Sequence, residues 1–187
     1  VFTIPFVFET GLVITNLPHI KKSLFNLFLD YMFFRIMKSI ENNFDNLEVN
    51  ELLINHFNEL RSVSPEGSTH VLDIDGLKNQ SIKFWSLWED TKLVGCGALK
   101  FLSKTHGEFK SIRVADNFKK KGYGKRIIVD LLSKSKVLGI QEISVETGAG
   151  EFFLPARKLF KSCGFEECEP FAHYSLDPNS CYYNLKF

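Results

Sequence analysis

The segment from Ile112 to Gly124 constrains this chain more than any other. A β-branched run that ends at Val114 is followed by a short basic turn, and Gly122 and Gly124 then open a helical pattern. Two glycines one residue apart let the backbone approach a ligand without side chains in the way. Free N–H groups at a helix start, together with the positive end of the helix dipole, bind phosphate oxygens. The segment therefore predicts a pyrophosphate site. Positive charge is added there by Lys119, Lys120, Lys121, Lys125 and Arg126.

Two common phosphate-binding patterns do not fit this segment. A P-loop requires G-x-x-x-x-G-K-[ST], which the run KKKGYGKR lacks. The dinucleotide fingerprint requires a third glycine, and none follows Gly124 at the required spacing. The phosphate ligand is therefore of another kind.

Periodicity along the chain predicts an α/β domain. Apolar residues at three- and four-residue spacing indicate helices, whereas β-branched and aromatic runs bounded by turn residues indicate strands. The expected helices cover 47–61, 71–78, 123–138 and 155–162. The expected strands cover 82–88, 93–101, 108–114, 141–146, 165–169 and 181–187. An antiparallel meander that leads into a β–α–β unit gives one mixed central sheet flanked by helices.

Composition limits the classes of protein that fit. The 187 residues are 44% hydrophobic, which is enough for a sizeable core in about one domain. With 23 basic and 22 acidic side chains, the net charge of +1 gives no electrostatic reason to expect nucleic acid or an acidic membrane as partner. The cysteines form no C-x-x-C pair, and we interpret them as reduced thiols of a cytoplasmic protein. They are Cys96, Cys163, Cys168 and Cys181.

Residues 1–36 differ from the rest of the chain because they are unusually rich in phenylalanine. Charged residues interrupt their apolar runs, so neither a membrane span nor a secretory signal is indicated. Three interpretations stay open: translation that starts at Met32 or Met37, a packed structural extension, or an amphipathic helix over about 20–40 that lies on a membrane or a partner. We expect 37–187 to form the main domain and leave the status of 1–36 open.

The glycine segment resembles motif A of the GNAT N-acetyltransferase family. In that motif a strand ends in Val, and five residues later comes Gln or Arg, followed by x-x-Gly-x-Gly or Ala. Val114, Lys119, Gly122 and Gly124 take these places here. Lys119 departs from the pattern, a change that should matter little because the family's phosphate contacts there are mostly backbone amides.

A second segment resembles motif B of the same family, Asn-x-x-Ala-x-x-Leu-Tyr-x-x-x-Gly-Phe. The run A-x-x-L-F-x-x-x-G-F occupies 156–165, with Phe153 in the Asn place and Phe160 in the Tyr place. That Tyr is the family's usual general acid, so its absence puts this role in doubt. The two motifs at the right separation extend the resemblance over about 48–187.

Shorter runs, such as GEFKSIR from Gly107 and ETG from Glu146, resemble one subgroup of bacterial acetyltransferases. The resemblance implies a GNAT-like acyl-CoA N-acyltransferase fold, acetyl-CoA as co-substrate, and transfer to a primary amine of a small-molecule or amino-acid-like acceptor. It also implies that the donor enters where strands splay apart, between 112–114 and 143–146. The implied donor contacts are Ile112, Arg113, Val114, Lys119, Lys120, Lys121, Gly122, Tyr123, Gly124 and Lys125.

The resemblance also names catalytic candidates. Glu108 begins the motif A strand, where the family often has a catalytic carboxylate, and half-burial there would suit it as a base. Glu146 ends the neighbouring strand and is an alternative base or amine ligand. Tyr174 and Cys163 are candidates for the acid, although a thiolate also leaves without one.

Other residues are candidates for substrate binding. The helical region before the sheet shapes acceptor pockets in this family and contains Arg61, Ser64 and His70. Arg113 is a further candidate, for a substrate carboxylate. No metal-ligand cluster is visible around His56 or His106.

Two other functions compete with a small-molecule acetyltransferase. A non-catalytic CoA-binding sensor or interaction module fits the Phe at position 160. A protein N-acetyltransferase would need an open groove, which the aromatic C-terminal loop argues against. The sequence leaves a homodimer open and identifies no acceptor.

Overall fold

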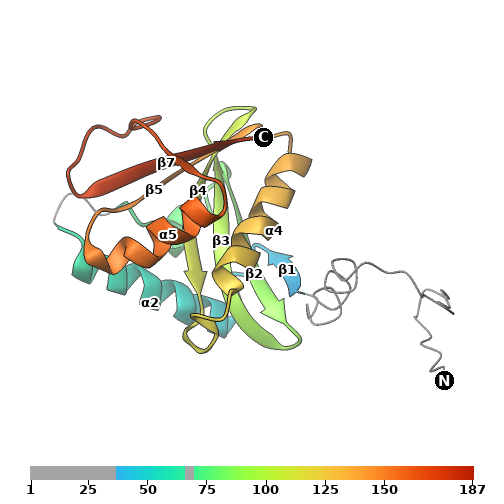
Figure 1. The fold of residues 1–187 in the computed structure, drawn as a ribbon. Helices are drawn as coiled ribbons and strands as arrows, with labels where there is room; N and C mark the ends of the chain where they lie inside the picture. Colours follow the sequence, from blue (N-terminus) through green and yellow to red (C-terminus); the bar gives the residue numbers. More distant parts are fainter. Residues whose placement is uncertain (1–36, 66–69) are drawn as a thin grey trace, which may run out of the picture. The chain divides into compact units, whose positions relative to one another are not determined.

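A seven-stranded mixed sheet organises residues 37–65 and 70–187, which are the residues described by the computed structural model. The strand order is β1-β2-β3-β4-β5-β7-β6 (Figure 1). β4 and β5 run parallel, whereas the other neighbouring strands are antiparallel. The strands are β1 (Met37–Glu41), β2 (Ile82–Glu89), β3 (Lys92–Phe101), β4 (His106–Val114), β5 (Glu142–Gly148), β6 (Glu166–Glu167) and β7 (Ser180–Lys186). The predicted meander and β–α–β unit are confirmed.

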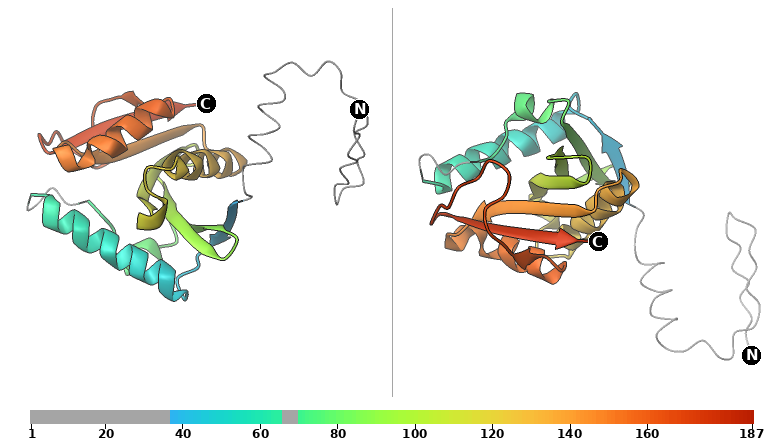
Figure 2. Two further views of the ribbon diagram at one scale, coloured as in Figure 1. Left: turned by 60° about the horizontal axis from the view of Figure 1, so that its bottom comes forward. Right: turned by 90° about the horizontal axis from the view of Figure 1, so that it is seen from above.

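Helices cover both faces of the sheet (Figure 2). They are α2 (Leu47–Val63), α3 (Ile74–Leu77), α4 (Tyr123–Val137) and α5 (Leu154–Ser162). On one face α2 and α3 bury Val49, Leu53 and Leu77 against the sheet. On the other, α4 and α5 bury residues such as Ile127 and Phe160. The apolar side chains on the two faces of the sheet therefore pack into two hydrophobic cores, one on each side.

Local chemistry explains where the elements begin and end. Asn46 caps α2, because its side chain accepts from the Val49 N–H at 3.1 Å. Asp73 caps α3 in the same way at Gly76, which starts that helix later than the predicted 71–78. A hairpin joins β2 to β3 at the predicted place, with Asp90 in the left-handed region at φ 54°.

The parallel contact between β4 and β5 is short. It pairs His106 with Glu142, Gly107 with Ile143 and Glu108 with Ser144. After Glu108 the two strands separate, β5 continuing along β7 and β4 along β3. The predicted splay between 112–114 and 143–146 is therefore wrong for 143 and 144, which pair with β4, and the strands separate only after Ser144. Beyond these pairs the facing backbone groups of β4 and β5 have no pairing with each other.

The first strand was not predicted. Met37–Glu41 pairs with β2 from Met37↔Glu89 to Glu41↔Trp85. An amphipathic helix over about 20–40 is therefore wrong for its last residues, because 37–40 lie in this strand. The remainder of that prediction, and the other predictions for 1–36, lie outside the described residues.

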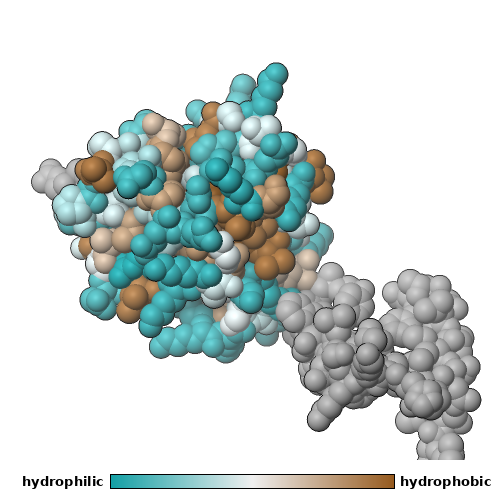
Figure 3. All heavy atoms as spheres, turned by 45° about the horizontal axis from the view of Figure 1, so that its top comes forward, coloured by the Kyte–Doolittle hydropathy of each residue, from teal (hydrophilic) through white to brown (hydrophobic). Residues whose placement is uncertain are grey.

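The surface seen with the top of the molecule turned forward is mostly hydrophilic, with separate hydrophobic patches between the polar side chains (Figure 3). Exposed apolar side chains include Val129, Val137 and Phe152. Among the described residues, no helix has the length and apolar character needed to cross a membrane.

Candidate active site

A cavity of about 620 Å³ lies where β4 and β5 separate. Its walls come from the end of β4, the β4–α4 loop, the end of β5, α5 and the inner face of α2. The backbone of β4 bends beside it, because Ser111 has a φ of 50° and the β3–β4 register shifts between Cys96 and Ala98. The cavity therefore joins the glycine segment to the polar side chains of β4 and β5.

The glycine segment forms one end of the cavity. Gly122 has a φ of 84° and stands as the N-cap of α4, where among the described residues no side chain caps the helix. A Cβ at this position would meet no described atom within 4 Å, so the space beside the first turn is open. The N–H groups of the first helical turn have no partners within the helix, a property that suits a helix start to bind an anion.

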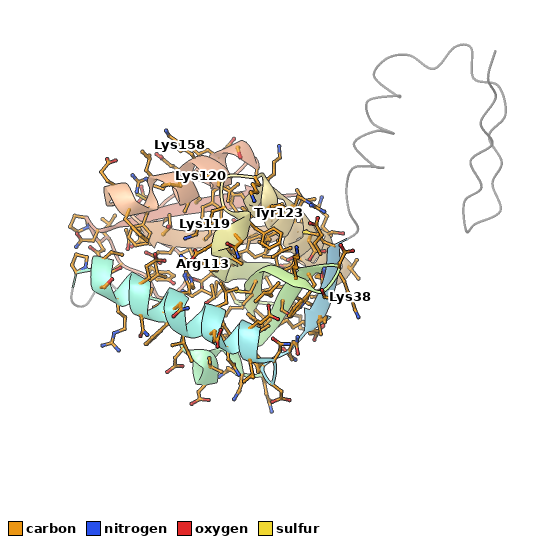
Figure 4. All side chains as sticks on the ribbon, turned by 90° about the horizontal axis from the view of Figure 1, so that it is seen from below. Lys38, Arg113, Lys119, Lys120, Tyr123 and Lys158 are labelled. Atoms are coloured by element: carbon orange, nitrogen blue, oxygen red, sulfur yellow. The ribbon has the colours of Figure 1, made fainter. Side chains whose placement is uncertain are left out.

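Gly124 has a different function, because it allows close packing. A Cβ there would lie 2.8 Å from Leu159 Cδ2, so the glycine lets α4 and α5 approach each other beside the cavity. Three lysines of the segment line this end: Lys119, Lys120 and Lys125. Figure 4 shows Arg113, Lys119 and Lys120 following one another from α2 toward α5.

Two predicted donor contacts have side chains that lie outside the cavity lining. Lys121 Nζ donates to the Asn117 carbonyl at 2.9 Å. The Tyr123 hydroxyl donates to Glu89 at 2.9 Å, and Arg126 lies over its ring. Their backbone groups remain at the start of α4. The other eight predicted donor contacts line the cavity: Ile112, Arg113, Val114, Lys119, Lys120, Gly122, Gly124 and Lys125.

A buried hydrogen-bonded group lies behind the middle of the cavity. Glu108 is completely buried, rather than half-buried as predicted, and Tyr174 donates to its Oε1 at 2.6 Å. Lys110 Nζ donates to the Tyr174 hydroxyl at 2.8 Å and lies 3.2 Å from Glu108 Oε1. Burial and the neighbouring Glu108 hold the pKa of Tyr174 well above its usual range, so the hydroxyl stays protonated. Of these three residues Lys110 lines the cavity.

Glu146 differs from Glu108 because it lines the cavity itself. Ser180 Oγ donates to its Oε1 at 2.7 Å. Burial raises the pKa of Glu146, although the Ser180 bond and the charges of Lys110 and His70 oppose this effect. A carboxylate with a raised pKa, open to a cavity, is suited to accept a proton near neutral pH.

Arg113 is held by carboxylates on the α2 side of the cavity. Its guanidinium pairs with Glu59 of α2 and lies 3.5 Å from Asp116. His56 lines the cavity beside them, and burial, followed by the charge of Arg113, lowers its pKa to about 4. His56 is therefore neutral at pH 7, and Arg113 is not an uncompensated cation.

The predicted acceptor residues divide into two groups. Ser64 and His70 line the cavity, and the His70 ring meets the Tyr174 ring edge-on at 5.0 Å. Arg61 is exposed, and its guanidinium lies over the Phe57 ring instead. Lys110 was missed by the sequence analysis. The available signal was its place two residues after Glu108 on the same strand face.

Phe160, which takes the Tyr place of motif B, has apolar surroundings in the structure. Its ring is buried, packs near Phe165 and Tyr183, and closes part of the cavity. Phe153, in the motif's Asn place, packs on Gly148, where a Cβ would lie 2.2 Å from the ring. Cys163 packs at the edge of the core, and burial raises the pKa of its thiol. Within 37–65 and 70–187, no cluster of His, Cys, Asp and Glu could hold a metal ion.

Comparison with known proteins identifies the family. Residues 48–165 match the family model described as the acetyltransferase (GNAT) family. The chain belongs to the GNAT acetyltransferases. It is 41% identical to YsnE of Bacillus subtilis, an uncharacterized N-acetyltransferase, over 74% of this chain and 92% of that protein. It is 39% identical to YedL of Escherichia coli, also an uncharacterized N-acetyltransferase, over 73% and 86%.

Solved structures agree on the fold. A Bacillus subtilis acetyltransferase in complex with CoA superposes with a TM-score of 0.62, at 19% identity, over 81% of this chain and 99% of that one. The predicted family, subgroup and fold class are therefore confirmed, and this GNAT chain is an acetyltransferase.

Proposed function

We propose that this GNAT acetyltransferase moves the acetyl group of acetyl-CoA to the primary amine of a small-molecule or amino-acid-like acceptor. The observation that carries the proposal is the continuous cavity, which has an uncapped helix start at one end and the carboxylate of Glu146 farther along. A phosphate-bearing donor suits the first feature, and an amine suits the second. The proposal places the enzyme in the cytoplasm.

The donor end has the shape and charge that acetyl-CoA requires. The pyrophosphate would meet the first-turn N–H groups of α4 together with Lys119, Lys120 and Lys125. The pantetheine arm carries amide groups, and the β4 backbone beyond Glu108 has no pairing with β5. Hydrogen bonds between this arm and the strand, near Ile112 and Val114, would extend the sheet by one ligand strand.

We assign proton abstraction to Glu146. The acceptor amine must lose a proton before its nitrogen can attack the thioester carbon, and Glu146 faces the cavity with a pKa raised by burial. As the C–N bond forms, negative charge develops on the carbonyl oxygen. A backbone N–H of β4 near the bend at Ser111 is the donor that would stabilise this oxyanion.

Glu108 and Tyr174 act on this site through Lys110. Both lie outside the cavity lining, and their hydrogen bonds converge on Lys110. We therefore assign them a positioning role. When the C–S bond breaks, the leaving group is a thiolate, whose conjugate acid has a pKa of about 8.5 in free Cys. Such a group leaves without a side-chain acid at Phe160, and it takes its proton from water or from the acceptor.

The alternative from another class is a CoA-binding sensor without turnover, which is favoured by the apolar Phe160. Such a sensor would also bind CoA at the donor end of the cavity, but it would not need Glu146 as a base. A protein acetyltransferase differs in the acceptor. Turnover of free small amines separates both alternatives from the proposal.

The test is calorimetric titration with acetyl-CoA, with ATP and NAD as controls, followed by a thiol-release assay over a panel of amines. We expect micromolar binding of acetyl-CoA alone. Gly122→Glu should abolish it, because a carboxylate would then occupy the open space beside the helix start. A folded protein that fails to bind acetyl-CoA would overturn the proposal. Binding without release of thiol from any small amine would favour the sensor or a protein acceptor.

A further inference from the structure

The cavity beyond the donor end carries charges of both signs. Glu146 supplies a carboxylate on β5, and Lys110 supplies an ammonium on β4. The two side chains are close enough for the charge of Lys110 to act on Glu146, as does that of His70. A neutral or purely cationic amine would interact with Glu146 and leave Lys110 without a ligand.

Lys110 shares its carboxylate partner, Glu108, with a second lysine. The buried Glu108 carboxylate lies 3.2 Å from Lys110 and 4.0 Å from Lys100, so two ammonium groups share one carboxylate. Of the three N–H groups of Lys110 Nζ, one donates to Tyr174, and the ion pair with Glu108 occupies at most one more. At least one N–H is therefore left for the cavity that Lys110 lines.

The other cations along the cavity are compensated or lie at the donor end. Arg113 faces two carboxylates, Glu59 and Asp116, and Asp116 is also paired with Lys119 at 2.6 Å. Lys120 and Lys125 stand beside the start of α4. Arg113, the residue that the sequence suggested for a substrate carboxylate, thus faces two carboxylates of its own chain, whereas Lys110 shares one with Lys100.

We propose that the acceptor is a zwitterion, whose carboxylate binds the ammonium of Lys110 while its amine faces Glu146. The inference rests on the proposed function and narrows its acceptor class. One ammonium with an N–H directed at the cavity matches a monoanionic carboxylate better than a phosphate dianion. Tyr174 and Glu108 hold the Lys110 side chain in place, so the site is formed before the acceptor arrives.

The experiment compares matched acceptors that differ by the carboxylate alone. The pairs are phenylalanine with 2-phenylethylamine, and leucine with 3-methylbutylamine. The intact protein is assayed for kcat and KM on each, as wild type, Lys110→Gln, Lys110→Arg and Lys100→Gln. Acetyl-CoA binding by calorimetry shows for each variant that the donor site is folded.

We expect wild type to favour the carboxylate-bearing member of a pair by about 10- to 100-fold in kcat/KM, the range for one charge-assisted hydrogen bond. Lys110→Gln should remove this preference mainly through KM, so that the carboxylate-bearing member loses more kcat/KM than the plain amine does. Lys110→Arg should retain most of the preference. Lys100→Gln should retain it as well, because Lys100 pairs with the same Glu108 but does not line the cavity.

Three results would overturn the inference. Equal turnover of both members by wild type would refute it and leave the proposed function intact. A Lys110→Gln variant that loses both members equally would show that Lys110 is merely structural. If acetyl-CoA binds and no amine of either kind is acetylated, the proposed function fails, and the zwitterionic acceptor fails with it.

Discussion

His56 makes the stability of this domain depend on pH in a predictable direction. It is 6% exposed on α2, and burial, with a smaller contribution from Arg113, lowers its pKa from 6.5 to about 4. Between these values the unfolded chain binds a proton at His56 and the folded chain does not. The stability that neutral His56 contributes is therefore present above pH 6.5 and is lost as the pH falls toward 4.

The size of this effect follows from the shift. The full difference between the two pKa values corresponds to about 3 kcal/mol, and about 2 kcal/mol of it falls between pH 7 and pH 5. The charged groups that act on His56 are Arg113, Glu59 and Lys119, and a substitution of His56 alone leaves all three in place. The loss can therefore be assigned to the imidazole.

Replacement of His56 by Gln keeps a polar side chain and removes the titration. We expect wild type to lose about 2 kcal/mol more than His56→Gln in the free energy of unfolding between pH 7 and pH 5. Urea unfolding followed by the fluorescence of the buried Trp85 and Trp88 measures this difference. Between pH 7 and pH 8 the two proteins should run parallel, which is the internal control. Parallel curves down to pH 5 would refute the reasoning.

Two further predictions concern the walls of the cavity. Gly124→Ala places a Cβ 2.8 Å from Leu159 Cδ2, so that the Leu159 side chain must shift where α5 packs on α4; we expect a loss of about 1 kcal/mol in urea unfolding and a higher KM for acetyl-CoA. Glu146→Gln should lower kcat about 100-fold or more, because it removes the proposed base. The same change should raise Tm at pH 7, because burial raises the pKa of Glu146 above 4.5 and its ionised form therefore destabilises the fold at pH values above that pKa. At pH 4, below the ordinary pKa of a Glu carboxyl, most of the gain in Tm should disappear; an equal gain at both values would contradict the assignment.

The fold could be predicted from the sequence where the pattern of a segment is local. The glycine segment, the hairpin at 89–92 and the end of β4 at Val114 follow from turn residues and apolar runs. Residues 37–41, MKSIE, have no strand pattern of their own and become β1 because β2 offers a free edge. Similarly, the predicted strand at 165–169 shortens to Glu166–Glu167.

The backbone of the site could be predicted from the sequence, but the pairing of its charged side chains could not. Which cations stay free depends on ion pairs between residues far apart in sequence, such as Arg113 with Glu59 and Lys100 with Glu108. No spacing rule gives these pairs. For the same reason Glu108 was expected to be half-buried and is fully buried, whereas Lys110 was not singled out at all.

The short contact between β4 and β5 has a mechanical consequence. The two parts of the sheet, β1–β4 and β5–β7, are joined directly by the three residue pairs from His106↔Glu142 to Glu108↔Ser144. A donor that binds along the separated strands would contact both parts of the sheet at once. Because Lys110 lies on one part and Glu146 on the other, any change in the separation of β4 and β5 would change the width of the acceptor cavity.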